Sequence, residues 1–370
     1  MYHHLPPGGA MNFFHQLVRR VTNRVAYTVF TPQVDTASNP LTRLLALRRE
    51  EKRIAAEIDG GQFEVVAVHA SQITQAPGLI RLVHLPTVYY MQEPRRASFE
   101  PGYRQALRGK HRAGLFGLPR EVIVSVYEAE LRRADIAATK SASVLVANSR
   151  FTAERIRSSY NRQAQVCHLG VDTKLFALAE SPRAYRVLSV GAIDPTKGHD
   201  FVIRAIARIA TPRPLFEVVG ERLLPGYDTE LRALALEVGV ELTIHHGVPL
   251  AHLRELYQAA AVTACAAVGE PFGLTPLESA SCGTPIVAVD SGGYKETVEE
   301  GKTGRLVPAE LHSFQGALEE ILAGNFPASP GEIRAAVANR WSWDQTVRRW
   351  EEILFSASKA EPVALTPSVR

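Results

Sequence analysis

Apolar and polar positions follow a pattern along this chain that predicts buried strands separated by amphipathic helices. Short apolar runs bounded by turn residues are typical of strands buried on both faces. Helical periodicity fills the segments between these runs, most clearly at residues 41–58 and 121–140. Alternating βα units predict parallel sheets covered by helices on both faces. The predicted strands are residues 25–30, 63–69, 87–91, 143–148, 186–191, 215–220, 240–246, 262–265 and 285–289.

The length of 370 residues suits two domains of roughly 150–200 residues each. Periodicity is lost where Gly170, Pro182 and several small residues occur, as is typical of a linker. We therefore predict two Rossmann-like, doubly wound α/β domains and an amphipathic helix after them, with a disordered tail. The predicted bounds are 1–168 and 186–341 for the domains, 169–185 for the linker, 342–358 for the helix and 359–370 for the tail.

The beginning of the chain departs from this pattern. A Gly- and Pro-rich turn at residues 5–10 leads into a helical pattern, yet only four residues precede the turn. A parallel domain of this type should open with an apolar strand. We therefore expect that the first strand is missing or truncated, or that the true start lies upstream.

Composition and charge exclude several classes of protein. The chain is 46% hydrophobic and 22% charged, has no apolar run near the roughly 18 residues of a membrane span, and shows no secretory signal. Three cysteines without CxxC spacing argue against a disulfide framework or zinc site and favour a cytoplasmic location. The net charge of +4 is too small for a nucleic-acid-binding signature. It leaves two interpretations, a solvated basic surface or weak peripheral attraction to a membrane.

The segment with the most chemistry is residues 269–289, where Glu270 and Glu278 flank Phe272-Gly273-Leu274. Gly273 lets backbone approach a ligand closely, and a helix start after it offers free N–H groups to a diphosphate. Glu270 is then expected to face sugar hydroxyls and Glu278 two ribose hydroxyls. A capping box, with Thr275 as N-cap and Glu278 as the third helical residue, explains Glu278 without a ligand. It does not explain Glu270.

This segment resembles the E-x7-E motif of the retaining GT-B glycosyltransferases of family 4, the glycosyl transferases group 1. Further matches in the same order cover nearly the whole chain: residues 6–10, 90–96, 147–156, 166–172, 189–200, 218–221 and 291–307. The resemblance implies that Glu270 contacts the donor sugar and Glu278 the ribose. It also implies a C-terminal domain that binds a nucleoside-diphosphate sugar, an N-terminal domain that binds a glycan or lipid-linked acceptor, and an active site in a cleft between them. The helix at residues 342–358 is then expected to cross back to the N-terminal domain.

The turn at residues 190–198 follows a predicted strand and opens a helix. In the family, a turn of this kind places an arginine after its first glycine and a lysine before its last, and both neutralise the leaving diphosphate. Here Gly191 and Lys197 are present, but Ala192 occupies the arginine position. One cation is therefore missing, for which Arg222 or Lys295 could substitute.

Residues 90–96 carry a second departure, because Gln92 stands where family members often have histidine. Glutamine can hydrogen-bond a sugar hydroxyl but cannot titrate. With Glu93 and Arg95 we place it on the acceptor side of the cleft; Arg95 faces a phosphate, a polar acceptor or solvent.

Two glycine pairs complete the expected site. Gly8 and Gly9 fit either a tight turn or a backbone approach to a ligand, and Gly292 and Gly293 resemble the family turn beside the donor. Residues 147–156 are interpreted as structural, since Asn148 or Ser149 can cap a helix.

No D-x-D pair follows a predicted strand, so no metal and no other cofactor is expected. The resemblance implies transfer of a hexosyl group with retention, and we favour attack from the leaving-group side because no protein nucleophile is evident. Two alternatives remain open. One is a catalytically weak sugar-nucleotide binder, suggested by Ala192 and Gln92, and the other is a GT-B enzyme such as a phosphorylase or epimerase.

Overall fold

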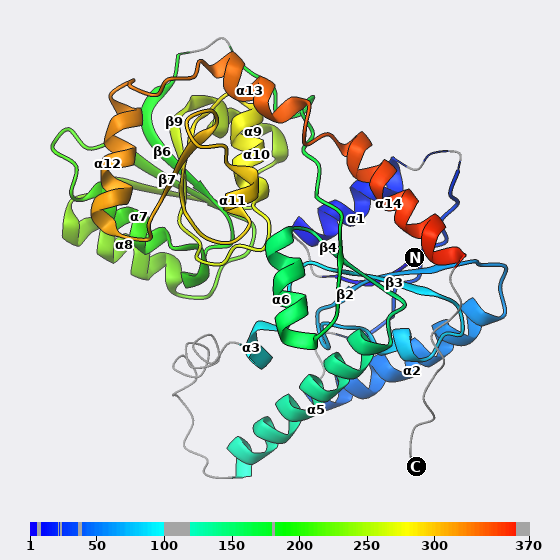
Figure 1. Cartoon of the computed structure of the whole chain (residues 1–370). Coiled ribbons are helices and arrows are strands. Elements are labelled where there is room, and N and C mark those ends of the chain that lie inside the picture. The colour runs from blue at the N-terminus through cyan, green and yellow to red at the C-terminus, as the bar shows by residue number, and fades with distance from the viewer. Residues whose placement is uncertain are drawn as a thin grey trace. The chain divides into compact units, whose positions relative to one another are not determined.

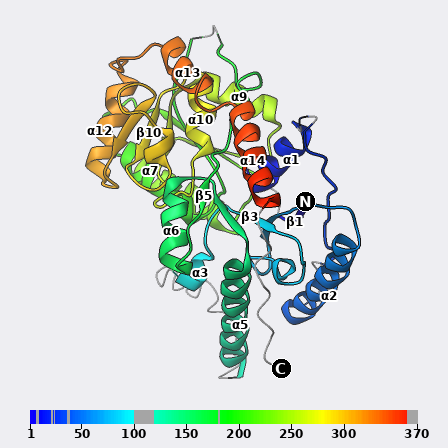
Figure 2. The same cartoon turned by 45° about the vertical axis from the view of Figure 1, so that its right-hand side comes forward.

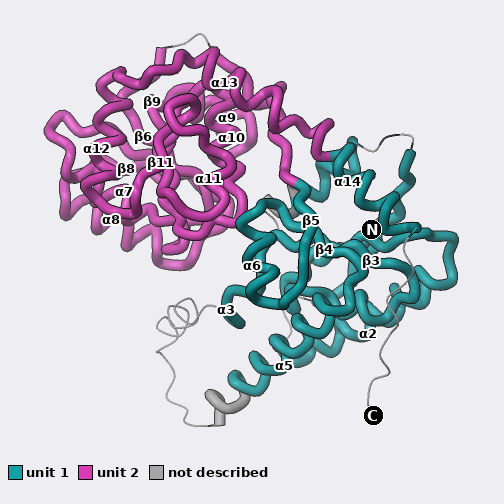
Figure 3. The backbone as a smooth tube through the Cα atoms, in the orientation of Figure 1, with its two compact units in different colours: residues 1–167, 347–370 teal, residues 168–346 magenta. Residues whose placement is uncertain are grey.

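A computed structural model describes residues 1–5, 9–20, 22, 24–35, 39–99, 119–179 and 182–359. These residues form two compact units, coloured separately in Figure 3. Unit 1 comprises Met1–Cys167 together with the segment from Val347 onward, and unit 2 comprises His168–Thr346. The chain therefore passes between the units twice.

Unit 1 contains a parallel sheet of five strands in the order β1-β2-β3-β4-β5. Its strands are β1 (Tyr2–His4), β2 (Val66–Ser71), β3 (Thr87–Met91), β4 (Val144–Ala147) and β5 (Gln165–Val166). Its helices are α1 (Gly9–Arg19), α2 (Pro40–Asp59), the 3₁₀ turn η1 (Gly78–Arg81), α3 (Arg96–Phe99), α5 (Pro119–Ser141), α6 (Arg150–Tyr160) and most of α14 (Trp343–Ser358).

Helices cover both faces of this sheet, with α2 and α5 on one side and α1 and α14 on the other (Figures 1 and 2). The alternation of side chains along β3 produces this arrangement. Tyr89 joins a core cluster with Ile54 of α2. Tyr90 points the other way, where its ring lies 4.5 Å from Phe13 of α1 and 5.7 Å from Trp350 of α14.

The first strand is present as the short β1. It pairs with β2 on one side, while an isolated bridge joins Tyr2 to Phe30 on the other. The prediction of a full strand at residues 25–30 is wrong, because only Phe30 forms a bridge there. Its N–H donates to Met1 and its carbonyl accepts from His3. Half of this edge segment is exposed, including Val29 (42%), so burial does not hold it in a regular ladder.

Unit 2 contains a parallel sheet of six strands in the order β11-β10-β9-β6-β7-β8. The strands are β6 (Ala184–Val190), β7 (Leu215–Gly220), β8 (Leu242–His246), β9 (Ala260–Cys265), β10 (Ile286–Val289) and β11 (Gly304–Val307). The helices are η2 (Pro195–Lys197), α7 (His199–Ile206), α8 (Tyr227–Val238), α9 (Leu250–Ala259), α10 (Leu274–Ser281), α11 (Tyr294–Thr297), α12 (Leu311–Leu322) and α13 (Pro330–Ala338).

The strand order of unit 2 is that of the Rossmann fold, which confirms the predicted fold class for this part of the chain. Strands β3 and β7 have the predicted bounds, and the other predicted strands, apart from residues 25–30, differ by a few residues at their ends. Sequence patterns did not reveal β1, β5 or β11, which contain two to four residues each.

The segment predicted as a linker is packed on unit 2. Val171 N–H donates to the carbonyl of Trp341, and the Arg334 guanidinium donates to the carbonyls of Thr173 and Phe176. The segment shows no helical or strand periodicity because these bonds to Trp341 and Arg334 fix its path, and no regular helix or strand does. Of the predicted disordered tail, all residues after Lys359 lie outside the described part of the chain.

Candidate functional site

The strand order of unit 2 determines where a ligand site is expected. The direction in which successive strands are added to the sheet reverses between β6 and β9, two parallel strands that lie side by side in its middle. In open α/β sheets, ligands bind beyond the carboxyl ends of the strands at such a switch point. The loop after β6 begins at Gly191 and the loop after β9 leads to Glu270. The two segments with the strongest motifs therefore meet at this point.

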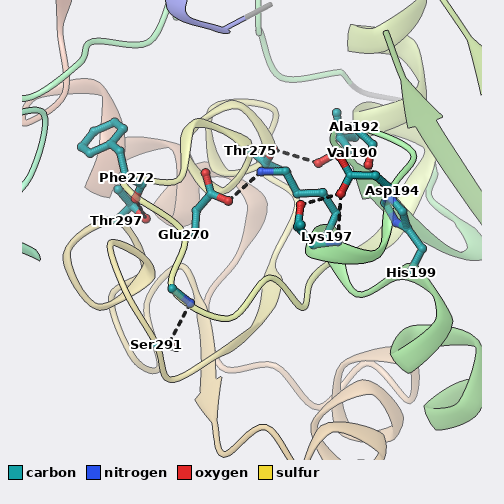
Figure 4. Close-up of polar contacts among 12 residues, drawn as sticks. Val190, Ala192, Asp194, Lys197, His199, Glu270, Phe272, Thr275, Ser291 and Thr297 are labelled. Carbon is teal, nitrogen blue, oxygen red and sulfur yellow. Dashed lines mark hydrogen bonds and ion pairs between the residues drawn. The ribbon is translucent and has the colours of Figure 1, made fainter. Parts of the chain in front are cut away.

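Lys197 and Glu270 form an ion pair across the switch point. The ammonium of Lys197 lies 2.7 Å from Oε2 of Glu270, and the side chains are 28% and 17% exposed. Figure 4 shows the two side chains pointing toward one another from the two loops. Both are thus accessible to a ligand, and they supply a cation and a carboxylate within one hydrogen-bond length.

The loop after β6 is held rigidly by neighbouring backbone and by His199. Gly191 N–H donates to Val219, and Ile193 N–H donates to the Arg222 carbonyl. The His199 ring lies between the Ser189 hydroxyl, 3.1 Å from Nδ1, and the Ala192 carbonyl, 3.0 Å from Nε2. A carbonyl only accepts, so Nε2 carries the proton and Nδ1 accepts from the serine. Burial lowers the pKa of His199 to about 4, so the ring is neutral at physiological pH.

The loop after β9 turns sharply at Gly273 to start α10. Gly273 has φ +96°, and a β-carbon there would lie 2.8 Å from the Tyr294 ring, so only glycine fits without strain. No side chain caps this helix start. The hydroxyl of Thr275 instead donates to the carbonyl of Val190, as Figure 4 shows. The capping-box interpretation of Glu278 is therefore wrong, since Gly273 is the N-cap.

Gly292 and Gly293 pack directly beneath the Glu270 loop. A β-carbon at Gly292 would lie 2.4 Å from the carbonyl oxygen of Glu270, and one at Gly293 would lie 2.4 Å from that of Phe272. Gly293 N–H also donates to the Glu270 carbonyl at 2.7 Å. This close approach positions Glu270 and accounts for both glycines. Their predicted contact with the donor stays a prediction.

Glu278 lies one turn into α10, where it accepts a hydrogen bond of 2.8 Å from the Tyr257 hydroxyl. Burial raises its pKa from 4.5 to about 6, although the tyrosine bond acts in the opposite direction. The folded state therefore favours the protonated carboxyl. As the pH rises from 4.5 through 6 this side chain ionises, and its contribution to the free energy of unfolding is lost. A carboxylate with a raised pKa is a candidate for a binding role, and its predicted contact with the ribose stays a prediction.

The remaining predicted donor residues are placed as follows. Leu274 is the first residue of α10. Gly191 packs on the aliphatic part of Lys197, and a β-carbon added at Gly191 would lie 3.2 Å from that chain. Phe272 is only 2% exposed, and its ring lies 5.6 Å from that of Trp341. In Figure 4 this ring points away from Lys197. Packing therefore accounts for Phe272 without a ligand, and its contact with the donor stays a prediction.

The two candidates to replace the missing arginine differ in their surroundings. Lys295 pairs with Asp290 at 3.3 Å and is 56% exposed. Arg222 is exposed, and its carbonyl accepts from Ile193, the residue after Ala192. The backbone of Arg222 thus lies beside the Ala192 turn.

The predicted acceptor residues belong to unit 1. The half-buried Gln92 follows β3, and its amide nitrogen is buried without a hydrogen-bond partner. The Glu93 carbonyl accepts from the Gln75 side chain. The Arg95 guanidinium pairs with Glu128 at 2.8 Å and is 14% exposed, so it is neither solvated nor free. Gly9 is the first residue of α1, and Gly8 lies outside the described residues.

Sequence patterns missed several residues that build this site, notably His199, Tyr257 and Ser291. The Ser291 hydroxyl accepts from Gly269 N–H at the start of the Glu270 loop. Tyr257 is 21 positions from Glu278, so no local spacing joins them. His199 and Ser291 lay within recognised motifs, at residues 189–200 and 291–307, whereas Tyr257 did not.

In the described parts of the chain, no three His, Cys, Asp or Glu side chains are grouped so that they could hold a metal ion. None of the described helices is both long and apolar enough to cross a membrane.

The fold and this arrangement define a Rossmann-type unit with an ion pair at its switch point. Residues 171–339 match the family model for glycosyl transferases group 1. The predicted family is therefore confirmed.

Several curated relatives are named D-inositol 3-phosphate glycosyltransferase. The one from Acidothermus cellulolyticus is 34% identical over 240 residues, which are 58% of this chain and 53% of that protein. The one from Mycobacteroides abscessus is 31% identical over 236 residues, with 58% and 52% covered. This chain thus spans about half the length of the curated relatives it matches.

Solved structures establish the fold over nearly the whole chain. Sucrose-phosphate synthase from Thermosynechococcus elongatus has a TM-score of 0.74 at 18% identity and covers 95% of this chain and 94% of that one. HepE from Anabaena in complex with UDP-glucose has a TM-score of 0.73 at 19% identity, with 96% and 98% covered. With the two parallel sheets, these likenesses confirm the GT-B fold class.

Proposed function

We propose that this chain is a retaining, metal-independent glycosyltransferase that moves a hexosyl group from a nucleoside-diphosphate sugar to a glycan or lipid-linked acceptor. The observation that carries the proposal is the Lys197–Glu270 pair at the switch point of a group 1 domain. The cation suits a diphosphate, and the carboxylate suits sugar hydroxyls.

The donor is proposed to lie along the loops after β6 and β9. Its diphosphate faces Lys197 and the uncapped start of α10, its sugar faces Glu270, and its ribose faces Glu278. Diphosphate binding then replaces the Lys197–Glu270 pair, which releases the carboxylate for the sugar. Of the two candidate second cations, Arg222 is favoured because its backbone is anchored beside Ala192.

In the proposed reaction, the bond between the anomeric carbon and the diphosphate oxygen breaks first. The acceptor oxygen attacks the same face, and its proton passes to the departing phosphate. Lys197 and the backbone N–H groups of α10 hold the developing charge. NMR of the product tests this step, since an inverted anomeric configuration would reject it.

We further propose a cytoplasmic location, with the acceptor presented in solution or at a membrane surface. The net charge of +4 supports weak peripheral contact with anionic headgroups.

A thermal-shift panel of UDP, GDP, ADP and their sugar conjugates tests donor binding. A ligand at 100 times its Kd stabilises the protein by about 2.7 kcal/mol, which raises the melting temperature measurably. We expect one nucleotide to do so in the wild type and to lose most of its effect in Glu278→Ala. UDP is the first probe, because HepE was solved with it. If no nucleotide raises the melting temperature, the donor site is not functional.

The affinity for the donor should depend on pH through Glu278. Its carboxylate accepts the ribose hydroxyls only when ionised, and its pKa is raised to about 6. Affinity should therefore be constant above this value and fall by up to tenfold per pH unit below it. Isothermal titration with the intact sugar nucleotide, whose diphosphate carries no proton in this range, measures the effect. In Glu278→Gln the affinity should be lower and the pH dependence absent; a dependence that persists assigns the titration to another group.

Ala192 favours one alternative function, a sugar-nucleotide binder with little turnover. Normal donor affinity together with transfer no faster than donor hydrolysis would support it.

A further inference from the structure

The two segments that carry the chain into and out of unit 2 lie against each other. We call residues 168–171, where the chain enters this unit, the entry segment, and residues 341–346, where it leaves, the exit segment. Val171 N–H donates to the carbonyl of Trp341 at 2.8 Å. A β-carbon at Gly170 would lie 2.7 Å from the backbone of the exit segment, so only glycine fits there. The two segments therefore form one closely packed pair.

Both segments place a ring against Phe272. The His168 ring lies 6.0 Å from the Phe272 ring, and the Trp341 ring lies 5.6 Å from it. The rings of His168 and Trp341 are themselves 5.2 Å apart, with an interplanar angle of 74°. Distances of this size are typical of favourable aromatic pairs. We call this cluster of three rings the Phe272 clamp.

The Phe272 clamp holds the loop that carries Glu270. Only Pro271 separates the two residues, and its ring fixes one backbone dihedral of the connection. The Phe272 ring points away from Lys197 (Figure 4), so the clamp grips the loop from the side away from the ion pair. A shift of Phe272 is therefore expected to move Glu270 relative to Lys197.

His168 also holds the backbone of Glu270, through α11. Its Nε2 lies 3.0 Å from Oε2 of Glu296 in α11, and because a carboxylate only accepts, Nε2 is the donor. Glu296 N–H donates to the carbonyl of Gly293, and Gly293 N–H donates to the carbonyl of Glu270 at 2.7 Å. One imidazole thus contacts both the clamp and the helix on which the Glu270 backbone rests.

We propose that His168 and Trp341 are positioning residues for Glu270, and that the entry and exit segments set the position of its carboxylate through the Phe272 clamp. The proposal rests on the proposed function and adds two residues to its donor side. Burial accounts for Phe272 by itself, but the His168 side chain is 34% exposed and contributes little to a core. Its contacts lead to Glu270 from two directions. A carboxylate that binds a sugar has to be held within about 0.5 Å of its productive position, and such support supplies that precision.

His168→Ala and Trp341→Leu test the proposal without a ligand. The amide of Gly293 is the readout, because it is bonded to the Glu270 carbonyl. NMR hydrogen exchange should show this amide exchanging faster by about tenfold or more in both variants. The bonded amide of Gly191, in the other loop of the site, should keep its wild-type rate. Unchanged exchange at Gly293, or an equal rise at Gly191, overturns the proposal.

UDP-glucose and UDP test whether the carboxylate itself is displaced. They are the first probes because HepE was solved with each, and a donor selected by the thermal-shift panel is compared with its own diphosphate in the same way. In both variants the affinity for UDP-glucose should fall by about tenfold or more, since a hydrogen bond to a charged group is lost. The affinity for UDP should be unchanged, because UDP lacks the sugar that Glu270 faces.

Isothermal titration measures both affinities. A purely structural role of the two rings would weaken both ligands alike or neither of them, and either result overturns the proposal.

Two conservative variants and one control sharpen these experiments. His168→Gln keeps a donor for Glu296, and Trp341→Phe keeps a ring, so each should retain part of the affinity for UDP-glucose. Phe314→Leu is the matched control, because Phe314 is fully buried in the same unit and its ring lies 5.3 Å from that of Phe201. It should lower the melting temperature and leave both the amide exchange and the affinity for UDP-glucose unchanged. A loss of that affinity in the control would mean that any core truncation has this effect, and would reject the clamp.

The ligand-free readout separates this proposal from the proposed function. If the wild type binds no nucleotide while the Gly293 amide exchanges faster in both variants, the proposed function fails and the positioning of Glu270 stands. If the wild type binds a sugar nucleotide and neither readout changes in the variants, the positioning role fails and the donor site stands.

Discussion

Lys197→Met should lower the rate of sugar transfer by about 10²–10³-fold, with a smaller effect on donor affinity. Lys197 is the predicted cation of the β6 loop. The second cation of that turn is missing, because Ala192 occupies the arginine position. Charge on the departing diphosphate grows as the glycosidic bond breaks. The loss of the ammonium therefore raises the barrier more than it weakens ground-state binding. Steady-state kinetics with the donor selected by the thermal-shift panel measure both effects.

Two further variants sharpen this experiment. Lys197→Arg keeps the charge and should retain part of the rate. Lys302→Met removes a lysine that is 72% exposed and pairs with Glu299, so it should leave the rate unchanged. A wild-type rate in Lys197→Met would show that another cation neutralises the leaving group. Arg222→Met in that background would then identify it.

Trp350→Ala should destabilise unit 1 by about 3–5 kcal/mol, the cost of truncating a large core aromatic residue. Trp350 is fully buried, and its ring lies 5.7 Å from Tyr90 and 6.0 Å from His69. Its Nε1–H donates to the Tyr27 hydroxyl at 3.1 Å. Truncation removes this packing and leaves the tyrosine hydroxyl without its donor.

Denaturant unfolding with a probe in each unit measures the effect. The midpoint of unit 1 should fall while that of unit 2 is unchanged, because the side chain packs within unit 1. Trp350→Phe keeps an aromatic ring and should lose less than half as much stability. Equal shifts in both midpoints would mean that the units unfold as one body.

Local sequence was sufficient to predict a site residue where a motif directly followed a predicted strand. The position of Lys197 before the last glycine of one turn, and of Glu270 after another strand, predicted two residues that the fold brings to 2.7 Å. The Rossmann order explains why, since both loops leave the sheet at its switch point.

Sequence was insufficient where packing between distant segments decides the role of a residue. Phe272 has the motif position of a donor contact but the burial of a core residue. The sequence left open whether Asn148 or Ser149 caps the helix, and the structure shows that Ser149 does. The apolar run at residues 25–30 predicted a strand, but it lies at an exposed edge, where alternation carries little energetic weight.

The double passage of the chain between the units has a consequence for biosynthesis. Unit 2 is one uninterrupted insertion, His168–Thr346, whereas the core of unit 1 requires Trp350 from a segment translated after that insertion. On the ribosome, unit 2 can complete its fold while the α1 face of the unit 1 sheet still exposes Phe13 and Tyr90. The part of the protein that is made first is therefore the part that matures last.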